Sequence, residues 1–285
     1  MKKLSLIMQL TKPRLSLMVF VTAFIGMYLT PYNLEILPTV MALVGIYLLV
    51  SAACALNCFI EIDEDSKMDR TKTRPLVTEE INPVFAFFFG VSLWILSMMI
   101  LYFYSNTMTM LLGLIAFFTY LFVYTPLKKK TPFAVWVGAI PGALPPLMGH
   151  TTVMNDIDIV GISLFSLLFM WQLPHFLAIS LYNKLDYLKA GFKIYPNSIG
   201  NEKTKKLILI YTAILVLVPF VAFSRTTNQW FYSFSIICIG LVFFLYSVQG
   251  LIKKKEDENI WAKKYFLGSL IYLPTILVWM VWFIN

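Results

Sequence analysis

The chain has 285 residues, of which 59% are hydrophobic and only 13% are charged. Soluble globular domains carry about 25% charged residues, so this composition excludes an ordinary soluble protein. The net charge of +8 would suit a nucleic-acid partner, but the cations are confined to short stretches between long apolar runs, which excludes that role. The three cysteines lie inside apolar runs and are too few for a disulfide framework or a zinc site.

Apolar runs long enough to cross a bilayer of about 30 Å recur along the chain. They predict nine transmembrane helices, at about 15–31, 36–60, 83–105, 107–125, 133–154, 157–181, 204–223, 228–252 and 263–284. The first ten residues have no cleavable apolar core and predict an interfacial helix rather than a removed signal. The sequence therefore predicts an all-α membrane protein in which residues 1–285 form a single domain.

Lysine and arginine are distributed asymmetrically along this chain. They lie before the first predicted span and after the second, fourth, sixth and eighth, so that 22 of the 23 share one side and only Arg225 takes the other. Because positively charged loops stay in the cytoplasm, we expect a cytoplasmic N-terminus, and nine crossings leave Asn285 outside. The expected location is a bacterial plasma membrane, with active-site loops at about 61–82 and 182–203 facing the cytoplasm.

The stretch NCFIEIDEDSKMDRTKTRPL, residues 57–76, organises the functional prediction. Asn57, Glu61 and Asp65 are spaced by four, and each such step on a helix adds only about 40° of rotation, so their oxygens stack along one face. Cations follow within ten residues. Mg²⁺ prefers one or two carboxylates plus phosphate oxygens, while Arg and Lys bind the remaining phosphate charge. The stretch thus predicts a site for a phosphorylated substrate carrying Mg²⁺; the alternative is a plain solvated loop.

The predicted fifth span contains GAIPGALPPLMGH, with three prolines and three glycines. A helix with this composition is expected to be kinked or broken, and freed backbone groups at membrane depth must face protein or a cavity. Gly138 and Gly142 also permit close helix approach.

The predicted sixth span ends in WQLPH, which places Trp171, Gln172 and His175 inside an apolar helix. Polar side chains within a span indicate a functional site; the alternative is a hydrogen bond between helices. The loop after this span mixes Lys184 and Asp186 with further cations and resembles the loop after the second span, which suggests a weak internal repeat. Convergence of the two loops would surround a diphosphate with carboxylates and cations.

At these residues the chain resembles the UbiA superfamily of intramembrane prenyltransferases, and most closely the protoheme IX farnesyltransferases, also called heme O synthases. The pattern Asn-x-x-x-Asp-x-x-x-Asp falls on Asn57, Glu61 and Asp65, with Glu61 in place of the usual Asp. The other matching elements are Met68, Arg70, Thr71, Arg74 and Pro75; Tyr124 and Thr125; Pro145, Pro146 and Gly149; Trp171, Gln172, Pro174 and His175; and Asp186, Tyr187, Ala190 and Gly191. Asn183 and Leu185 depart from the pattern, which commonly has Arg and an acid there.

The resemblance implies a UbiA-like bundle of nine helices around a central cavity. It implies transfer of a farnesyl group from farnesyl diphosphate to a vinyl group of heme b, with addition of water, to give heme O. The implied catalytic and Mg²⁺-binding residues are Asn57, Glu61, Asp65 and Asp186. The implied diphosphate-binding residues are Lys67, Arg70, Arg74 and Lys184, and the implied acceptor-binding residues are Trp171, Gln172, His175 and Tyr187.

Two alternatives stay open on the sequence. One is a prenyltransferase of the same superfamily that acts on an aromatic quinone precursor. The other is a cation-coupled transporter or channel, which the polar residues in broken spans would suit. The expected partners are farnesyl diphosphate, heme b and membrane lipid, with no nucleic acid, and the product would pass to a heme A synthase or a terminal oxidase.

Overall fold

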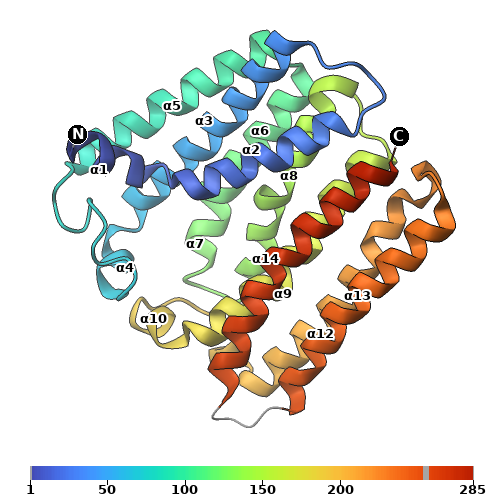
Figure 1. The fold of residues 1–285 in the computed structure, drawn as a ribbon. Helices are drawn as coiled ribbons and strands as arrows, with labels where there is room; N and C mark the ends of the chain where they lie inside the picture. The colour runs from blue at the N-terminus through green and yellow to red at the C-terminus, as the bar shows by residue number, and fades with distance from the viewer. Residues whose placement is uncertain (1, 253–256, 285) are drawn as a thin grey trace.

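Long helices running side by side make up the computed structural model, which describes residues 2–252 and 257–284 (Figure 1). The first half contains α1 (Lys2–Leu10), α2 (Pro13–Tyr28), α3 (Ile36–Ile60), α4 (Ile62–Lys67), α5 (Pro83–Tyr104), α6 (Thr107–Phe118), the π-helix η1 (Thr119–Tyr124), α7 (Thr125–Leu127) and α8 (Ala134–Met154). The second half contains α9 (Ile159–Tyr182), α10 (Lys184–Lys189), α11 (Tyr195–Ser198), α12 (Asn201–Leu217), the 3₁₀ helix η2 (Val218–Arg225), α13 (Gln229–Ile252) and α14 (Glu258–Phe283).

Seven helical segments among the described residues are long and apolar enough to cross a membrane: Ile36–Ile60, Pro83–Tyr104, Thr107–Leu127, Ile159–Tyr182, Asn201–Arg225, Gln229–Ile252 and Glu258–Phe283. The remaining two predicted spans correspond to α2, which has only 16 residues, and to α8, which carries three prolines. The protein is thus an all-helical, multi-pass membrane protein. The total of nine crossings and the orientation remain predictions.

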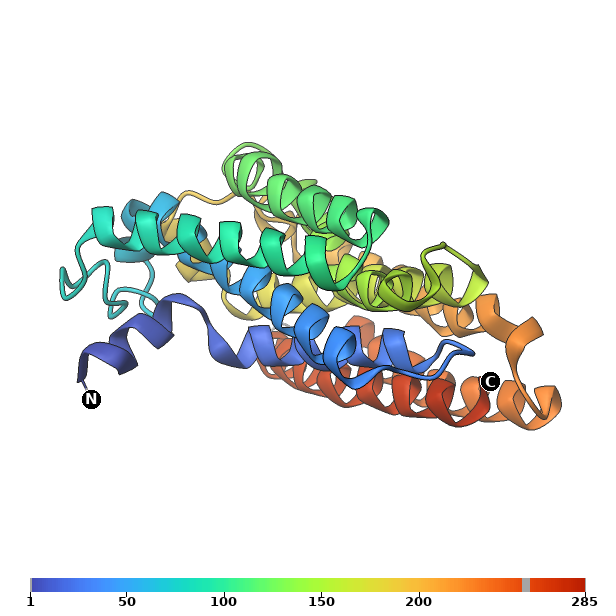
Figure 2. The same cartoon turned by 90° about the horizontal axis from the view of Figure 1, so that it is seen from above.

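The loops sort to two ends of the bundle. At one end Asn106 Nδ2 donates to Thr151 O at 2.6 Å, and Thr227 N donates to Phe283 O at 2.7 Å. At the other end lie α4 and α10 (Figure 1), and Lys193 N donates to Lys128 O at 2.9 Å. The N-terminus and C-terminus are far apart in both views (Figure 2). The basic loops that the structure describes therefore gather at one end; the run at 253–256 lies outside the described residues.

The helix α8 is continuous from Ala134 to Met154, so a break in the fifth span is excluded and the kink stays a prediction. Each proline removes one backbone donor, but the intervening residues keep enough helical bonds to hold the segment together. Close packing against α2 depends on two glycines. A Cβ on Gly149 would lie 1.9 Å from Ala23 O, and a Cβ on Gly26 would lie 2.0 Å from Pro146 O. These residues, rather than Gly138 and Gly142, bring two helix backbones together.

The predicted fourth span contains an irregularity that the apolar pattern does not reveal. Thr119–Tyr124 form the π-helix η1, after which Thr125 N and the Thr125 hydroxyl both donate to the carbonyl of Tyr120. The ring of Pro126 clashes with the carbonyl four residues earlier in a regular α-helix, which explains the wider turn. Tyr120 and Tyr124 extend from this segment with their ring centroids 5.5 Å apart.

Candidate active site

Asn57, Glu61 and Asp65 form the stacked row of oxygens that their spacing predicts. Although α3 ends at Ile60 and α4 begins at Ile62, the helical hydrogen bonds continue through the junction. Glu61 N donates to Asn57 O at 3.0 Å, and Asp65 N donates to Glu61 O at 2.8 Å. All three side chains are buried and line the same cavity.

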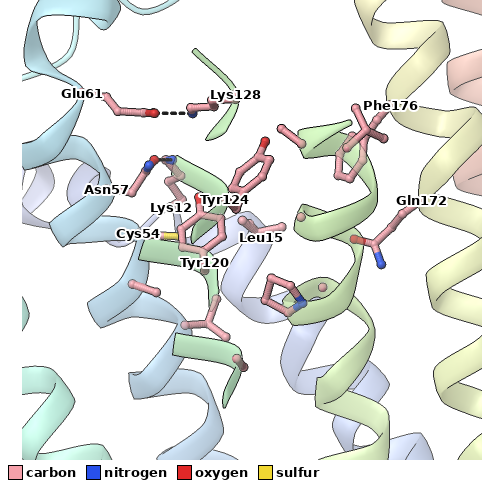
Figure 3. Close-up of a pocket in the computed structure, with 18 of the residues that line it drawn as sticks. Lys12, Leu15, Cys54, Asn57, Glu61, Tyr120, Tyr124, Lys128, Gln172 and Phe176 are labelled. Atoms are coloured by element: carbon pink, nitrogen blue, oxygen red, sulfur yellow. Dashed lines mark hydrogen bonds and ion pairs between the residues drawn. The ribbon is translucent and has the colours of Figure 1, made fainter. Parts of the chain in front are cut away.

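The amide of Asn57 has a defined orientation. The hydroxyl of Thr125 donates its one proton to Tyr120 O at 2.9 Å, so it can only accept from Asn57 Nδ2, which lies 3.2 Å away. The carbonyl oxygen of Asn57 is thereby turned towards the cavity, where Lys12 Nζ lies 3.4 Å from it (Figure 3). An amide held in this way presents an oxygen, and not a nitrogen, to a bound cation.

Each carboxylate of the row is paired with a cation from elsewhere in the chain. Glu61 forms an ion pair with Lys128 (Figure 3), and Asp65 forms one with Arg74. Lys128 Nζ also lies 4.8 Å from the centroid of the Phe192 ring. Burial lowers the pKa of Lys128, and the nearby Glu61 carboxylate partly offsets this effect.

The two loops that the sequence predicts to converge do meet. Arg70 N donates to Asp186 Oδ2 at 3.4 Å, and the Arg70 guanidinium lies over the Tyr187 ring, 5.1 Å from its centroid. Further out, Asp69 binds Lys189 at 2.5 Å. Hydrogen bonds from Lys189 and Lys72 lower the pKa of Asp69 to about 2. The loop after α4 and the segment α10 therefore form one charged cover over the end of the bundle.

Beneath this cover lies a cavity of about 480 Å³. Its walls come from α2, α3, α6, η1, α8 and α9 and from both charged loops. The charged lining residues are Lys12, Glu61, Asp65, Arg70, Arg74, Lys128 and Lys193. These are five cations and two carboxylates, a formal excess of three positive charges that suits a multiply charged anion.

Away from the charged mouth the cavity lining becomes apolar. The aromatic residues of the lining are Tyr120, Tyr124, Phe176 and Phe192, with Phe117 and Tyr187, and its aliphatic residues include Leu15, Val19, Ile46, Leu49, Val50, Ala53 and Met148. Along α3 the lining runs from Asn57 to Ile46, which corresponds to a depth of about 16 Å at the helical rise per residue. The cavity can therefore hold a ligand with an anionic head and a long apolar tail.

Seven of the predicted site residues line this cavity: Asn57, Glu61, Asp65, Arg70, Arg74, Gln172 and Tyr187. Asp186 lies next to it through its contact with Arg70. Lys67 is exposed and is not part of the wall. Lys184 points to α12 instead, where its Nζ donates to Asn201 Oδ1 at 2.8 Å. The structure therefore gives no support to a diphosphate role for Lys67 and Lys184.

The WQLPH segment divides between two faces of α9. Gln172 lines the cavity, whereas Trp171 and His175 pack against α14. Trp171 Nε1 donates to Ser269 O at 2.8 Å. Ser269 Oγ donates to Phe266 O at 2.6 Å, so His175 Nδ1 is the donor in its 2.7 Å contact with Ser269 Oγ. The expectation that Trp171 and His175 face a bound acceptor gains no support, because both are used to join two helices.

Three cations that line the cavity, Lys12, Lys128 and Lys193, were not among the predicted site residues. Lys12 precedes α2, and Lys128 belongs to the triple lysine after the fourth span. The sequence favours a topology anchor for both, with phosphate contact as the alternative for the triple lysine. Lys12 is also in the left-handed conformation, with φ of 47°, which is unusual for a residue with a side chain. That strain at the cavity mouth is typical of a functional position.

The fold and the site thus define a polytopic membrane protein with an internal cavity that is rich in cations at one end and apolar at the other. The sequence pattern described as "UbiA prenyltransferase family" matches residues 19–271. The chain belongs to this family.

Relatives and solved structures agree with this assignment. A protoheme IX farnesyltransferase of Myxococcus xanthus (strain DK1622) is 40% identical over 267 residues, covering 94% of this chain and 90% of the relative. One of Anaeromyxobacter dehalogenans (strain 2CP-C) is 39% identical over 274 residues, with 94% and 90% covered. Among solved structures, a UbiA homologue from Archaeoglobus fulgidus bound to GPP and Mg²⁺ has a TM-score of 0.69 at 19% identity, with 96% of this chain and 99% of that chain covered. A structure of digeranylgeranylglyceryl phosphate synthase has a TM-score of 0.80 at 17% identity, covering 99% and 98%.

Proposed function

We propose that this protein transfers the farnesyl group of farnesyl diphosphate to a vinyl group of heme b, with addition of water, to give heme O. The observation that carries the proposal is the two-part cavity, whose cationic mouth suits a diphosphate and whose apolar depth suits a prenyl chain. The choice of heme as acceptor is supported by the relatives, which are named protoheme IX farnesyltransferases and match most of the chain.

The diphosphate would lie at the mouth between Arg70, Arg74 and Lys128. Guanidinium groups and a lysine bind phosphate oxygens through charge-assisted hydrogen bonds. Arg74 and Lys128 are paired with Asp65 and Glu61 in this structure, so binding would transfer these cations from carboxylate to phosphate. The negative charge that develops as the diphosphate leaves would be stabilised by groups already held in place.

The row of oxygens fits Mg²⁺. Among residues 2–252 and 257–284, no cluster of three or more His, Cys, Asp or Glu side chains forms a metal site alone. Mg²⁺ commonly uses one or two carboxylates and completes its shell with phosphate oxygens and water. Asn57 Oδ1, Glu61 and Asp65 would hold the ion, with Asp186 at the edge of the site, and bound Mg²⁺ would neutralise diphosphate charge. A UbiA homologue solved with GPP and Mg²⁺ supports this part of the proposal.

The allylic cation left by diphosphate departure needs a dry and electron-rich environment. Tyr120, Tyr124 and Phe176 line the cavity next to its charged mouth, and π faces stabilise cations. Exclusion of bulk water by the charged cover would prevent early quenching. Phe59, two residues after Asn57 in the sequence, packs against Phe87 with a centroid distance of 5.5 Å and is absent from the cavity wall.

The site would face the cytoplasm of a bacterial plasma membrane, since the basic loops and both site loops share one end of the bundle. The whole chain would act as one domain around this cavity. Transfer of the product to a heme A synthase or a terminal oxidase stays a prediction. A quinone precursor as acceptor is the second candidate; the names of the relatives favour heme, and the family assignment leaves a transporter role without support.

In the presence of Mg²⁺, purified protein in detergent or lipid should convert heme b and farnesyl diphosphate into a more hydrophobic heme. Chromatography and mass spectrometry would detect this product. Asp65→Asn should lower kcat/KM about a hundredfold, because it removes a charged oxygen from the row, while circular dichroism stays unchanged. Asp63→Asn, on the exposed side of α4, is the matched control. Prenylation of a quinone precursor in preference to heme, or no prenylated product from folded protein, would refute the proposal.

A further inference from the structure

Gln172 is the feature of the cavity that diphosphate binding and prenyl binding leave unexplained. It lies on α9 with Phe176 and Ser180, one turn apart on the face that lines the cavity. Figure 3 shows it across the cavity from Asn57 and Glu61. A buried amide placed away from the charged mouth has no evident use in holding an anion.

The amide of Gln172 is fixed in one orientation. Its Nε2 donates to Leu168 O at 3.0 Å and to Ala139 O at 3.3 Å. Both amide protons are used in this way, so the Oε1 atom must take the opposite direction. There it lies against Gly142, where a Cβ would be only 2.0 Å from it. Gly142 therefore makes room for this oxygen.

The Oε1 atom of Gln172 accepts no hydrogen bond from the residues that the structure describes. Two other polar groups on the wall are already hydrogen-bonded. The Ser180 hydroxyl donates its proton to Leu177 O at 2.7 Å, and the Tyr187 hydroxyl accepts from Arg70 Nη2 at 3.3 Å. Gln172 thus supplies a fixed hydrogen-bond acceptor on the cavity wall. Such an oxygen would hold a small ligand that donates a hydrogen bond.

The proposed reaction needs one such donor. The C–O bond of farnesyl diphosphate breaks and the electron pair leaves with the diphosphate. The π pair of the heme vinyl group forms the new C–C bond, which leaves a cation on the vinyl carbon attached to the ring. A lone pair of water then forms the C–O bond, and the surplus proton passes to the departed diphosphate, the strongest base at hand.

The position of this water decides the product. Water near the farnesyl cation would give free farnesol, and a missing water would let the second cation lose a proton and form an alkene. We propose that Gln172 Oε1 binds the water that is added to the acceptor, and that it holds this water on the wall opposite the diphosphate site. This inference rests on the proposed function and adds a water-binding residue to it.

The test is the product distribution of two variants under the assay described above. Gln172→Met keeps the length of the side chain but removes the acceptor, and Gly142→Ala displaces the amide by its new Cβ. Each should lower the ratio of hydrated to unhydrated farnesylated heme roughly tenfold, the worth of one hydrogen bond, with a new product lighter by one water. Phe176→Leu, one turn away on the same face, is the control and should change the rate but leave the ratio intact.

An unchanged product ratio in both variants would overturn the inference. Complete loss of farnesyl transfer in both would also overturn it, because Gln172 would then act before water addition. If the wild-type protein makes no farnesylated heme at all, the proposed function itself fails, and the two failures are therefore distinguishable by the wild-type product alone.

Discussion

Lys128 illustrates how a single side chain acquires a function from residues far away in the sequence. It pairs with Glu61 and lies under the Phe192 ring, and burial lowers its pKa below the usual lysine value. In the sequence it is one of three lysines after an apolar run, and nothing separates it from Lys129 and Lys130. Lys129 pairs with Glu64 at 2.5 Å, outside the cavity wall.

The lowered pKa of Lys128 predicts a pH dependence for substrate capture. Below that pKa the ammonium is charged and attracts the diphosphate; as the pH rises through it, the charge and the attraction are lost. We expect kcat/KM, which reports ionisations of the free enzyme, to fall on the alkaline side at a pH below 10.5, the ordinary lysine value. Lys128→Arg should abolish this fall, because arginine stays charged. An alkaline limb that is identical in the variant would contradict the assignment.

The contacts of His175 predict a role in stability, whereas its sequence motif suggests a role in binding the acceptor. Its ring stacks on Trp171 at 4.4 Å and lies 4.9 Å from Phe266, and its Nδ1 bonds Ser269. His175→Ala should therefore lower the free energy of unfolding by about 2–4 kcal/mol through lost packing and a lost hydrogen bond, with KM for heme unchanged. Ser269→Ala should show a smaller loss of the same kind. A large rise in KM for heme at unchanged stability would restore His175 as an acceptor ligand.

At the scale of single elements, sequence periodicity predicts well what depends on one helix. The spacing of Asn57, Glu61 and Asp65 is sufficient to predict their alignment, because the helix carries it through the α3–α4 junction. Periodicity cannot predict what a side chain faces where this depends on the position of a second helix. Trp171 and Gln172 are neighbours, yet one faces α14 and the other faces the cavity, and only the position of α14 distinguishes them. The π-helix η1 is likewise invisible in an apolar run.

The residues at the apolar end of the cavity are expected to limit the length of the prenyl chain. Met148 on α8 is buried and lines the cavity, and its Cε and Leu49 Cδ2 each lie 3.1 Å from where a Cβ on Gly113 would be. The three residues therefore close the space between α3, α6 and α8. Met148→Ala should deepen the cavity and raise the preference for geranylgeranyl over farnesyl diphosphate about tenfold.

This preference is measured by competition between the two diphosphates with heme as acceptor. Met154→Ala, on the same helix but outside the cavity wall, is the control. A preference that does not change in Met148→Ala would place the chain-length limit at another part of the wall.

At the scale of the whole molecule, the cavity exists because loops far apart in sequence gather at one end. Arg70 meets Asp186 there, and Lys193 meets Lys128. The distribution of charge along the sequence predicts this gathering without any coordinates, since alternate loops must share a side of the membrane. It cannot predict which cation pairs with which carboxylate, because the pairs depend on side-chain positions from separate helices. The sequence therefore predicts the orientation of the bundle more directly than it predicts the side-chain pairs of the site.

That orientation makes a direct prediction about accessibility. In a background with Cys54, Cys58 and Cys238 replaced, Thr73→Cys lies in the exposed part of the loop after α4, and Asp156→Cys lies in the exposed turn between α8 and α9. A membrane-impermeant maleimide should label Asp156→Cys in spheroplasts and Thr73→Cys only in inverted vesicles, because basic loops are expected to face the cytoplasm. Labelling of Thr73→Cys in spheroplasts would place the diphosphate site on the outer face, where a substrate made in the cytoplasm does not reach it.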